Sequence, residues 1–259
     1  MKKSLILNLL VIAFFHSYNC FSQIVNVQKL AKFPTEEGFG GEISGSFNIK
    51  SGNTQLISLN GKGNIRYKIS RHVILFIFRG GFVKHKKETI QSKTFEHLRY
   101  RVNIYKLFEI ESYLQHEYDE FRKLLIRGLW GIGPRITFIS TKRFILGIGT
   151  SYMLEFIKTI PEEEKGIESR EELYHRWSNY LTFSLKILNN LFFSSTSFLQ
   201  PRFDKMSDVR LLTENSLRIV ITKHFSIKLN YIVSYETKPV APNVKKLDTS
   251  FGTELSFVF

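Results

Sequence analysis

The sequence predicts an all-β fold, namely a closed antiparallel transmembrane β-barrel of about 12 strands. Three observations support it: polar and apolar residues alternate over long runs, short and long connections alternate between the runs, and the chain ends on an aromatic residue. The runs have about ten or more residues, close to the ~9–11 that a tilted strand needs to cross a bilayer and longer than the ~5–6 of most soluble strands. A soluble sandwich, whose strands also alternate, is the alternative that these lengths disfavour.

Composition excludes several other classes of protein. The 259 residues include one Cys, 24 Phe and 11 Tyr, with 37 Lys and Arg against 23 Asp and Glu. One Cys cannot form a disulfide within the chain, and the aromatic content argues against a collagen-like or low-complexity chain. Basic chains often bind nucleic acid, but no basic helix or stacking motif accompanies the charge here, so we expect no nucleic acid partner.

Residues 1–22 are predicted to be a cleaved signal peptide. Lys2 and Lys3 precede the apolar run Leu5–Phe15, which is too short to span a bilayer, and small polar residues follow it. Cleavage after Ser22 removes two Lys and no acids, which takes the formal charge from +14 to 14 − 2 = +12.

The rest of the chain is expected to be one domain. Residues 23–38 form a predicted periplasmic lead-in, and 39–259 form the barrel. Acylation at Cys20 is an alternative fate of the N-terminus that Asn19 disfavours, because a small residue is wanted before a lipidated Cys.

The period-two alternation is clearest in four segments, Glu42–Lys50, Ile57–Ile69, Phe225–Glu236 and Phe251–Phe259. Charged residues stand mid-strand on the polar face, and aromatic residues gather near the ends of the apolar face. This distribution is typical of a wet lumen and of interfacial girdles. Continued along the chain, the pattern predicts strands at Gly40–Lys50, Thr54–Ile69, Val73–His85, Phe95–Tyr105, Glu109–Asp119, Leu124–Phe138, Arg143–Ile157, Leu173–Ile187, Leu191–Arg202, Val209–Thr222, Phe225–Glu236 and Leu247–Phe259.

The connections between these strands alternate in length. In such barrels the periplasmic turns are short and the outer loops are longer. The predicted short turns are Ser70–His72, Lys106–Phe108, Ile139–Lys142, Leu188–Asn190 and Lys223–His224. The predicted long loops are Lys86–Thr94, Lys158–Glu172, Phe203–Asp208 and Thr237–Lys246, and the two exceptions are the brief Ser51–Asn53 and Glu120–Lys123.

The last strand carries a predicted assembly signal. Outer-membrane barrels resemble one another in ending on an aromatic residue with aromatics or Leu at alternate positions before it. Leu255, Phe257 and Phe259 fit this resemblance. It implies an outer-membrane location and the barrel-assembly machinery as a partner.

Several short motifs, in order along the chain, carry a family resemblance. They are Gln23-Ile24-Val25-Asn26, Ser51-Gly52-Asn53-Thr54, Arg127 with Gly131 and Gly133, Lys238-Pro239, and Lys245-Lys246-Leu247-Asp248-Thr249. Together they resemble the salt-induced outer-membrane protein family, domain-of-unknown-function family 481, and the cleavage context resembles members from Bacteroidota. The resemblance implies an outer-membrane barrel with a stress-linked name and no assigned activity.

Polar rows are expected to face the lumen. Arg99, Arg101, Asn103 and Tyr105 are predicted to point one way on one strand, as are Glu109, Glu111, Gln115 and Glu117 on the next. A three-residue turn at Lys106–Phe108 would place Tyr105 beside Glu109 and Asn103 beside Glu111. Opposite charges would then face each other, either as a salt-bridged plug or beside a solute path. A residual positive lumen that favours anions is expected from Lys50, Lys62, Arg66 and Lys68.

No catalytic or metal-binding constellation is apparent, and no cofactor is expected. Ser112 and His116 share the apolar face of one strand, but four residues at ~3.3 Å each separate them by about 13 Å, beyond the reach of a nucleophile and its base. The seven His residues show no paired ligand spacing. Gly131 and Gly133 are expected to permit close strand packing.

Two functions remain open at this point. One is a passive pore for small solutes or anions, and the other is a non-conducting structural barrel that acts through its loops or its lipid contacts. Lys84, His85, Lys86 and Lys87 lie at an outer strand end, where the phosphates of outer-leaflet lipid would be neighbours. An outer-membrane lipid hydrolase is a distant third, so we expect no enzyme, and we expect a monomer.

Overall fold

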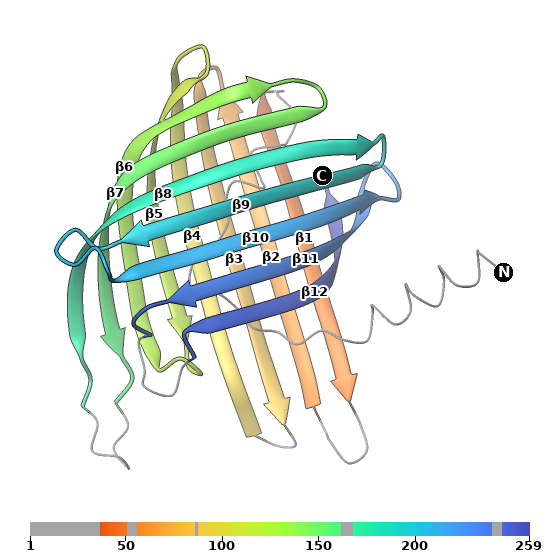
Figure 1. The fold of residues 1–259 in the computed structure, drawn as a ribbon. Coiled ribbons are helices and arrows are strands. Elements are labelled where there is room, and N and C mark those ends of the chain that lie inside the picture. The colour runs from red at the N-terminus through yellow and green to blue at the C-terminus, as the bar shows by residue number, and fades with distance from the viewer. Residues whose placement is uncertain (1–36, 51–55, 86–87, 162–167, 240–244) are drawn as a thin grey trace.

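The computed structural model describes residues 37–50, 56–85, 88–161, 168–239 and 245–259. In it twelve antiparallel strands follow one another around a closed barrel, and the last strand pairs with the first (Figure 1). The predicted fold class is therefore confirmed. The predicted signal peptide and nearly all of the predicted lead-in lie outside the described residues.

The strand boundaries agree with the predicted ones to within two residues, except at one strand start. The strands are β1 (Gly38–Lys50), β2 (Leu56–Ile69), β3 (His72–His85), β4 (Glu88–Tyr105), β5 (Phe108–Asp119), β6 (Leu124–Ser140), β7 (Phe144–Thr159), β8 (Glu171–Leu188), β9 (Leu191–Pro201), β10 (Val209–Val220), β11 (Phe225–Glu236) and β12 (Leu247–Val258).

The exception is the predicted loop Lys86–Thr94, which is wrong. β4 already begins at Glu88, opposite His85 of β3. The segment before Phe95 is polar, which is typical of a loop in a soluble protein. Where a strand rises beyond the apolar belt of a barrel, both of its faces meet water, so the backbone ladder continues without apolar side chains.

The tight turn between β4 and β5 corrects a predicted register. It contains only Lys106 and Leu107, and Lys106 has a positive φ of 47°. Tyr105 pairs with Phe108, and a register shift separates Tyr105 from Asn103. As a result Arg101 stands directly opposite Glu111 and Asn103 opposite Glu109, while Tyr105 is 65% exposed and points away from the lumen.

The barrel is apolar outside and polar inside. Its outer wall carries exposed large side chains such as Phe47, Trp130 and Leu181, whereas most buried positions are polar, with Ser, Arg and Glu the most frequent. Aromatic pairs gather on this wall, among them Trp130 with Tyr152, in an edge-to-face arrangement with ring centroids 6.3 Å apart. A soluble sandwich would bury its apolar face, so the alternative fold is excluded. None of the described residues forms a helix long and apolar enough to cross a membrane.

The seam between β1 and β12 is the shortest pairing in the barrel. Only Glu42–Gly45 pair with Leu255–Val258, whereas β1 pairs with β2 along all of Gly38–Lys50. Backbone hydrogen bonds of 3.1 Å join Gly41 to Phe259 in both directions. A Cβ at position 41 would lie against the ring of Phe259, so glycine lets the C-terminal aromatic close the seam.

A close approach of β6 to β7 yields a first prediction. A Cβ at Gly133 would overlap the carbonyl oxygen of Thr150, whereas a Cβ at Gly128 on the same strand meets open space. We expect Gly133→Ala to lower the free energy of unfolding by about 1–3 kcal/mol, because the backbones must separate. Gly128→Ala is the control and should stay within about 0.5 kcal/mol of wild type. Urea titration of the refolded barrel in detergent measures both, and equal effects would contradict the prediction.

Candidate functional site

Most of the buried charged side chains face the lumen. One cluster of them forms around a carboxylate that three arginines share. Glu155 of β7 accepts hydrogen bonds from Arg127 Nε at 2.6 Å, from Arg176 Nε at 2.7 Å and from Arg210. Arg127 also donates to Glu117 at 3.0 Å. Arg127 and Glu155 are both fully shielded from solvent. Buried charges persist only when they are paired in this way.

A second cluster lies around Glu111 of β5. Arg99 and Arg101 approach one Glu111 oxygen at 3.0 and 3.3 Å, and the hydroxyl of Tyr180 donates to the other at 2.8 Å. Tyr180 belongs to β8, so this hydrogen bond joins two strands of the wall that are not neighbours. Glu109 pairs with Arg135 beside this cluster.

Glycine makes room for the two tyrosines that project into the lumen. The ring of Tyr113 occupies the space that a side chain at Gly131 would fill, and the ring of Tyr180 does the same at Gly149. The predicted role in close strand packing is confirmed for Gly133 and not for Gly131. At Gly131 the close neighbour is a lumenal ring, whereas at Gly133 it is the backbone of β7.

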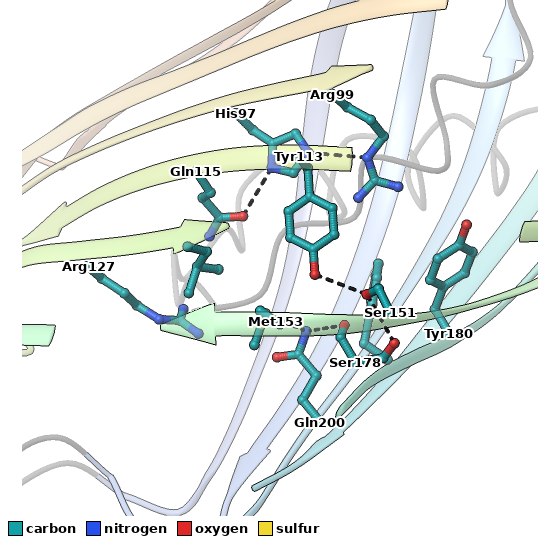
Figure 2. A pocket seen from close by; sticks show the side chains of 12 residues that line it. His97, Arg99, Tyr113, Gln115, Arg127, Ser151, Met153, Ser178, Tyr180 and Gln200 are labelled. Atoms are coloured by element: carbon teal, nitrogen blue, oxygen red, sulfur yellow. Dashed lines mark hydrogen bonds between the residues drawn. The ribbon is translucent and has the colours of Figure 1, made fainter. Parts of the chain in front are cut away.

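Between the two charge clusters lies a cavity of about 20 Å³ (Figure 2). Tyr113 and Ser151 share a hydrogen bond of 3.2 Å at its wall, and Gln200 donates to Ser178 at 2.9 Å. A space of this volume fits about one water molecule. At this cavity, side chains from β4 to β9 fill most of the space between the two clusters.

The opposite half is more basic and more open. Besides Arg210, which belongs to the Glu155 cluster, six cations face the lumen on β2, β3, β10 and β11. We call them the basic wall: Lys62, Arg66, Lys68, Arg79, Arg218 and Lys228. Three acids face the same region, Glu42, Glu214 and Glu254. Lys62 Nζ lies 2.5 Å from Glu254, with side chains 30% and 23% exposed, and Lys228 pairs with Glu42. Solvent thus reaches both side chains of the Lys62–Glu254 pair.

A third group of charges crosses the lumen mouth at the end with the longer connections. Arg122, in the connection after β5, lies 3.5 Å from Glu236 of β11 and 3.4 Å from Asp248 of β12. Asp208 receives Arg176 at 3.4 Å and Arg202 at 3.2 Å. At this end of the barrel, ion pairs therefore join residues of the connecting loops to residues of the strands.

The structure places the predicted lumenal residues as follows. Arg99 and Arg101 meet Glu111, Glu109 meets Arg135, and Glu117 meets Arg127. Lys62, Arg66 and Lys68 lie across the lumen from these pairs, on the basic wall. The side chain of Lys50 lies outside the described residues.

The predicted family and assembly positions fall in different places. Arg127 and Asp248 join the ion pairs of the lumen and mouth, and Pro239 follows β11, whereas Ser51, Gly52, Asn53 and Thr54 lie outside the described residues. Leu255, Phe257 and Phe259 are exposed on the outer wall. Phe257 packs on Phe225, with ring centroids 5.2 Å apart.

Ser112 and His116 do not form a catalytic pair. His116 is exposed on the outer wall, and its Nδ1 lies 2.7 Å from a Glu96 oxygen. Among the described residues no group of three or more His, Cys, Asp or Glu side chains has the geometry of a metal site.

Sequence reasoning missed Glu155, Arg176 and Arg210. Nothing in the sequence around them marks them as partners, and they meet only because β7, β8 and β10 curve around one axis. The available signal was Glu155 itself, which stands between Met153 and Ile157 in a row that is otherwise apolar or small. Such a residue needs a charged partner from another strand.

The Glu155 cluster yields a second prediction. Glu155→Gln keeps the shape but leaves three buried guanidinium groups without their shared anion, so we expect a loss of about 3–5 kcal/mol in the free energy of unfolding. Glu171→Gln is the matched control, because its ion pair with Lys158 is 57% exposed at the carboxylate and contributes at most about 1 kcal/mol. Urea titration of both variants measures the difference, and a Glu155→Gln loss as small as the control would contradict the role of the cluster.

Comparisons with known proteins agree with this architecture. No curated protein matches the chain. Among solved structures, the NanC porin has a TM-score of 0.50 at 9% identity, with 85% of this chain and 98% of that chain covered. The translocator domain of autotransporter NalP from Neisseria meningitidis has a TM-score of 0.55 at 7% identity, with 90% and 92% covered. An outer-membrane channel from Pseudomonas putida F1 has a TM-score of 0.53 at 8% identity, with 91% and 100% covered.

These likenesses concern the fold. The sequence itself matches the family described as "Protein of unknown function, DUF481" over residues 43–259, which is nearly the whole barrel. The predicted family is therefore confirmed, and the protein belongs to the DUF481 family of outer-membrane-type β-barrels.

Proposed function

We propose that this protein is an outer-membrane channel for small anions that conducts along its basic wall. The carrying observation is the exposure of Lys62 and Glu254, 30% and 23%, in the middle of the barrel. The carboxylate and arginines of the Glu155 cluster, which lie on β6, β7, β8 and β10, are shielded from solvent. A path for water and solute therefore runs beside the basic wall.

The electrostatics favour anions on this path. The basic wall has six cations against three acids, and low-dielectric walls focus the resulting field into the lumen. Ions pass a charged constriction when binding is favourable enough for entry and weak enough for exit. The pairs Lys62–Glu254 and Lys228–Glu42 weaken the attraction of the basic wall for a passing anion, because each acid partly neutralises its cation. Small anions fit this description, whereas large solutes do not fit a twelve-stranded barrel that is half filled.

Membrane insertion of the barrel is supported by its inside-out polarity. A closed ladder satisfies the backbone, and apolar side chains face outward, which are the two conditions for crossing a bilayer as strands. Lys84, exposed at the outer end of β3, is placed to contact lipid phosphates. The stress-linked role in this proposal rests only on the resemblance of the sequence motifs to the salt-induced family, and a monomer is the simplest state of such a barrel.

A non-conducting barrel is the second candidate. The observation that favours it is the pair of buried clusters around Glu155 and Glu111, which brace the lumen from wall to wall. In this reading the barrel acts through its loops or lipid contacts. An enzyme is not proposed, because His116 contacts Glu96 and lies four residues along the strand from Ser112.

Current measurements on planar bilayers distinguish the two candidates. The refolded protein should show stable channels whose reversal potential in a salt gradient favours chloride over potassium. Lys62→Gln removes one positive charge from the basic wall, so we expect a lower chloride preference. The exchange Lys62→Glu with Glu254→Lys keeps both the ion pair and the net charge, and should leave the preference close to wild type. Silence from a correctly folded barrel would favour the non-conducting candidate.

The C-terminal residue yields a further prediction, on assembly. Phe259 is exposed, and its backbone bonds to Gly41, so we propose that it serves both the assembly machinery and seam closure. Phe259→Asn should reduce the outer-membrane yield several-fold, measured as the heat-modifiable band in membrane fractions. Phe251→Asn changes an aromatic residue on the same strand face, and should reduce the yield less. Equal yields of both variants would contradict the assembly role.

A further inference from the structure

The seam between β1 and β12 is open over half of its length. In the paired part, Gly45 faces Leu255. Among the residues that the structure describes, 46–50 of β1 and 247–254 of β12 have a strand partner on one side only, β2 and β11 respectively. Figure 1 shows β1 and β12 together near the C-terminus and apart toward the end of β1. The open part lies at the end with the longer connections.

Two ion pairs hold the seam where it opens. Lys62 of β2 reaches over β1 to Glu254 of β12, and Lys228 of β11 reaches over β12 to Glu42 of β1. Glu254 is the first residue of β12 beyond the paired stretch. Backbone pairing therefore closes the seam at the C-terminal end of β12, and ion pairs between side chains join its two sides at the middle. Beyond the ion pairs, toward the end with the longer connections, the described residues of β1 and β12 do not pair with each other.

Unpaired strand edges cannot face hydrocarbon. In the bilayer core each exposed N–H and C=O is costly, which is why spanning sheets close completely. The two edges here must meet water or a polar group. The side chains that flank them on the outer wall are apolar and exposed, Phe47 at 65% and Phe251 at 41%. An occupant of the opening thus meets polar backbone and charge inside and apolar side chains outside.

We propose that the open seam is a lateral binding site for a lipid of the surrounding leaflet, with an anionic phosphate head at the lumen side and its tail along the outer wall. An anionic head group fits the local charge, because the cations Lys62, Lys228 and Arg79 surround Glu254. With Glu42 included, three cations meet two acids at this point. A phosphate head offers acceptors to the backbone N–H groups of the edges and to Lys62.

This site shares Lys62 and Glu254 with the proposed conduction path, so its tests use thiol chemistry and no current and can fail separately from the proposed function. The first tests the opening, in a Cys20→Ser background in which only introduced thiols are present. Phe47→Cys with Thr253→Cys would be directly opposite in a fully paired seam. Phe47→Cys with Leu59→Cys is the matched control, because these positions pair across β1 and β2. Heat-modifiability before oxidation confirms that both variants are folded.

In an open seam, copper-phenanthroline should oxidise the 47–253 pair at least tenfold more slowly than the 47–59 pair. Comparable rates would show a zipped seam and overturn the proposal. Gly45→Cys with Leu255→Cys, which face each other in the paired part and are exposed like the control, should oxidise as fast as the control. A slow 45–255 pair would also contradict the proposed division of the seam.

The second test identifies the occupant. Ser46→Cys places a single half-buried thiol at the start of the opening, and Lys223→Cys places one in an exposed turn at the far end. Dodecyl phosphate should slow the reaction of Ser46→Cys with a small uncharged methanethiosulfonate at least threefold, and dodecyltrimethylammonium should not. Neither amphiphile should protect Lys223→Cys. Protection of Ser46→Cys by both amphiphiles, or by neither, would overturn the anionic lipid site.

Discussion

The burial of Glu155 under three arginines is the constraint on which the rest of the barrel depends. A twelve-stranded barrel has an interior narrow enough for side chains to meet across it, and a lumenal strand face tolerates charge only if partners arrive from other strands. The three guanidinium groups come from β6, β8 and β10, so the pairing fixes the relative heights of strands that are not neighbours. The Glu111 cluster does the same between β4, β5 and β8.

That constraint divides the lumen into unequal halves. Where charges are matched and glycines admit the rings of Tyr113 and Tyr180, side chains fill the space and the wall is stiff. Where cations exceed acids, as on the basic wall, side chains stay partly solvated because full burial of an unmatched charge is costly. The cost of burying an unmatched charge therefore accounts both for the half of the lumen that is packed and for the half that is partly solvated.

The sequence was sufficient for strand number, boundaries and orientation because each depends on a local, period-two pattern. It was insufficient where an outcome depends on a single turn residue or on distant strands. Lys106 adopts a positive φ, which made the β4–β5 turn shorter than predicted and moved Glu111 opposite Arg101. The meeting of Glu155 with Arg210, 55 residues apart, follows from barrel closure, which no local pattern encodes. The start of β4 was missed because polar strand ends above the apolar belt look like loops.

Arg122 has a mechanical consequence. It stands in the connection between β5 and β6, yet its guanidinium meets Glu236 and Asp248 on β11 and β12, so it ties the far wall to the free edge of the sheet. Movement of β12 away from β1 is therefore limited by a side-chain strut anchored on the opposite side of the barrel. The strut restrains the start of β12 while backbone pairing with β1 restrains its end, so any bending of β12 is confined to the stretch between these two anchors.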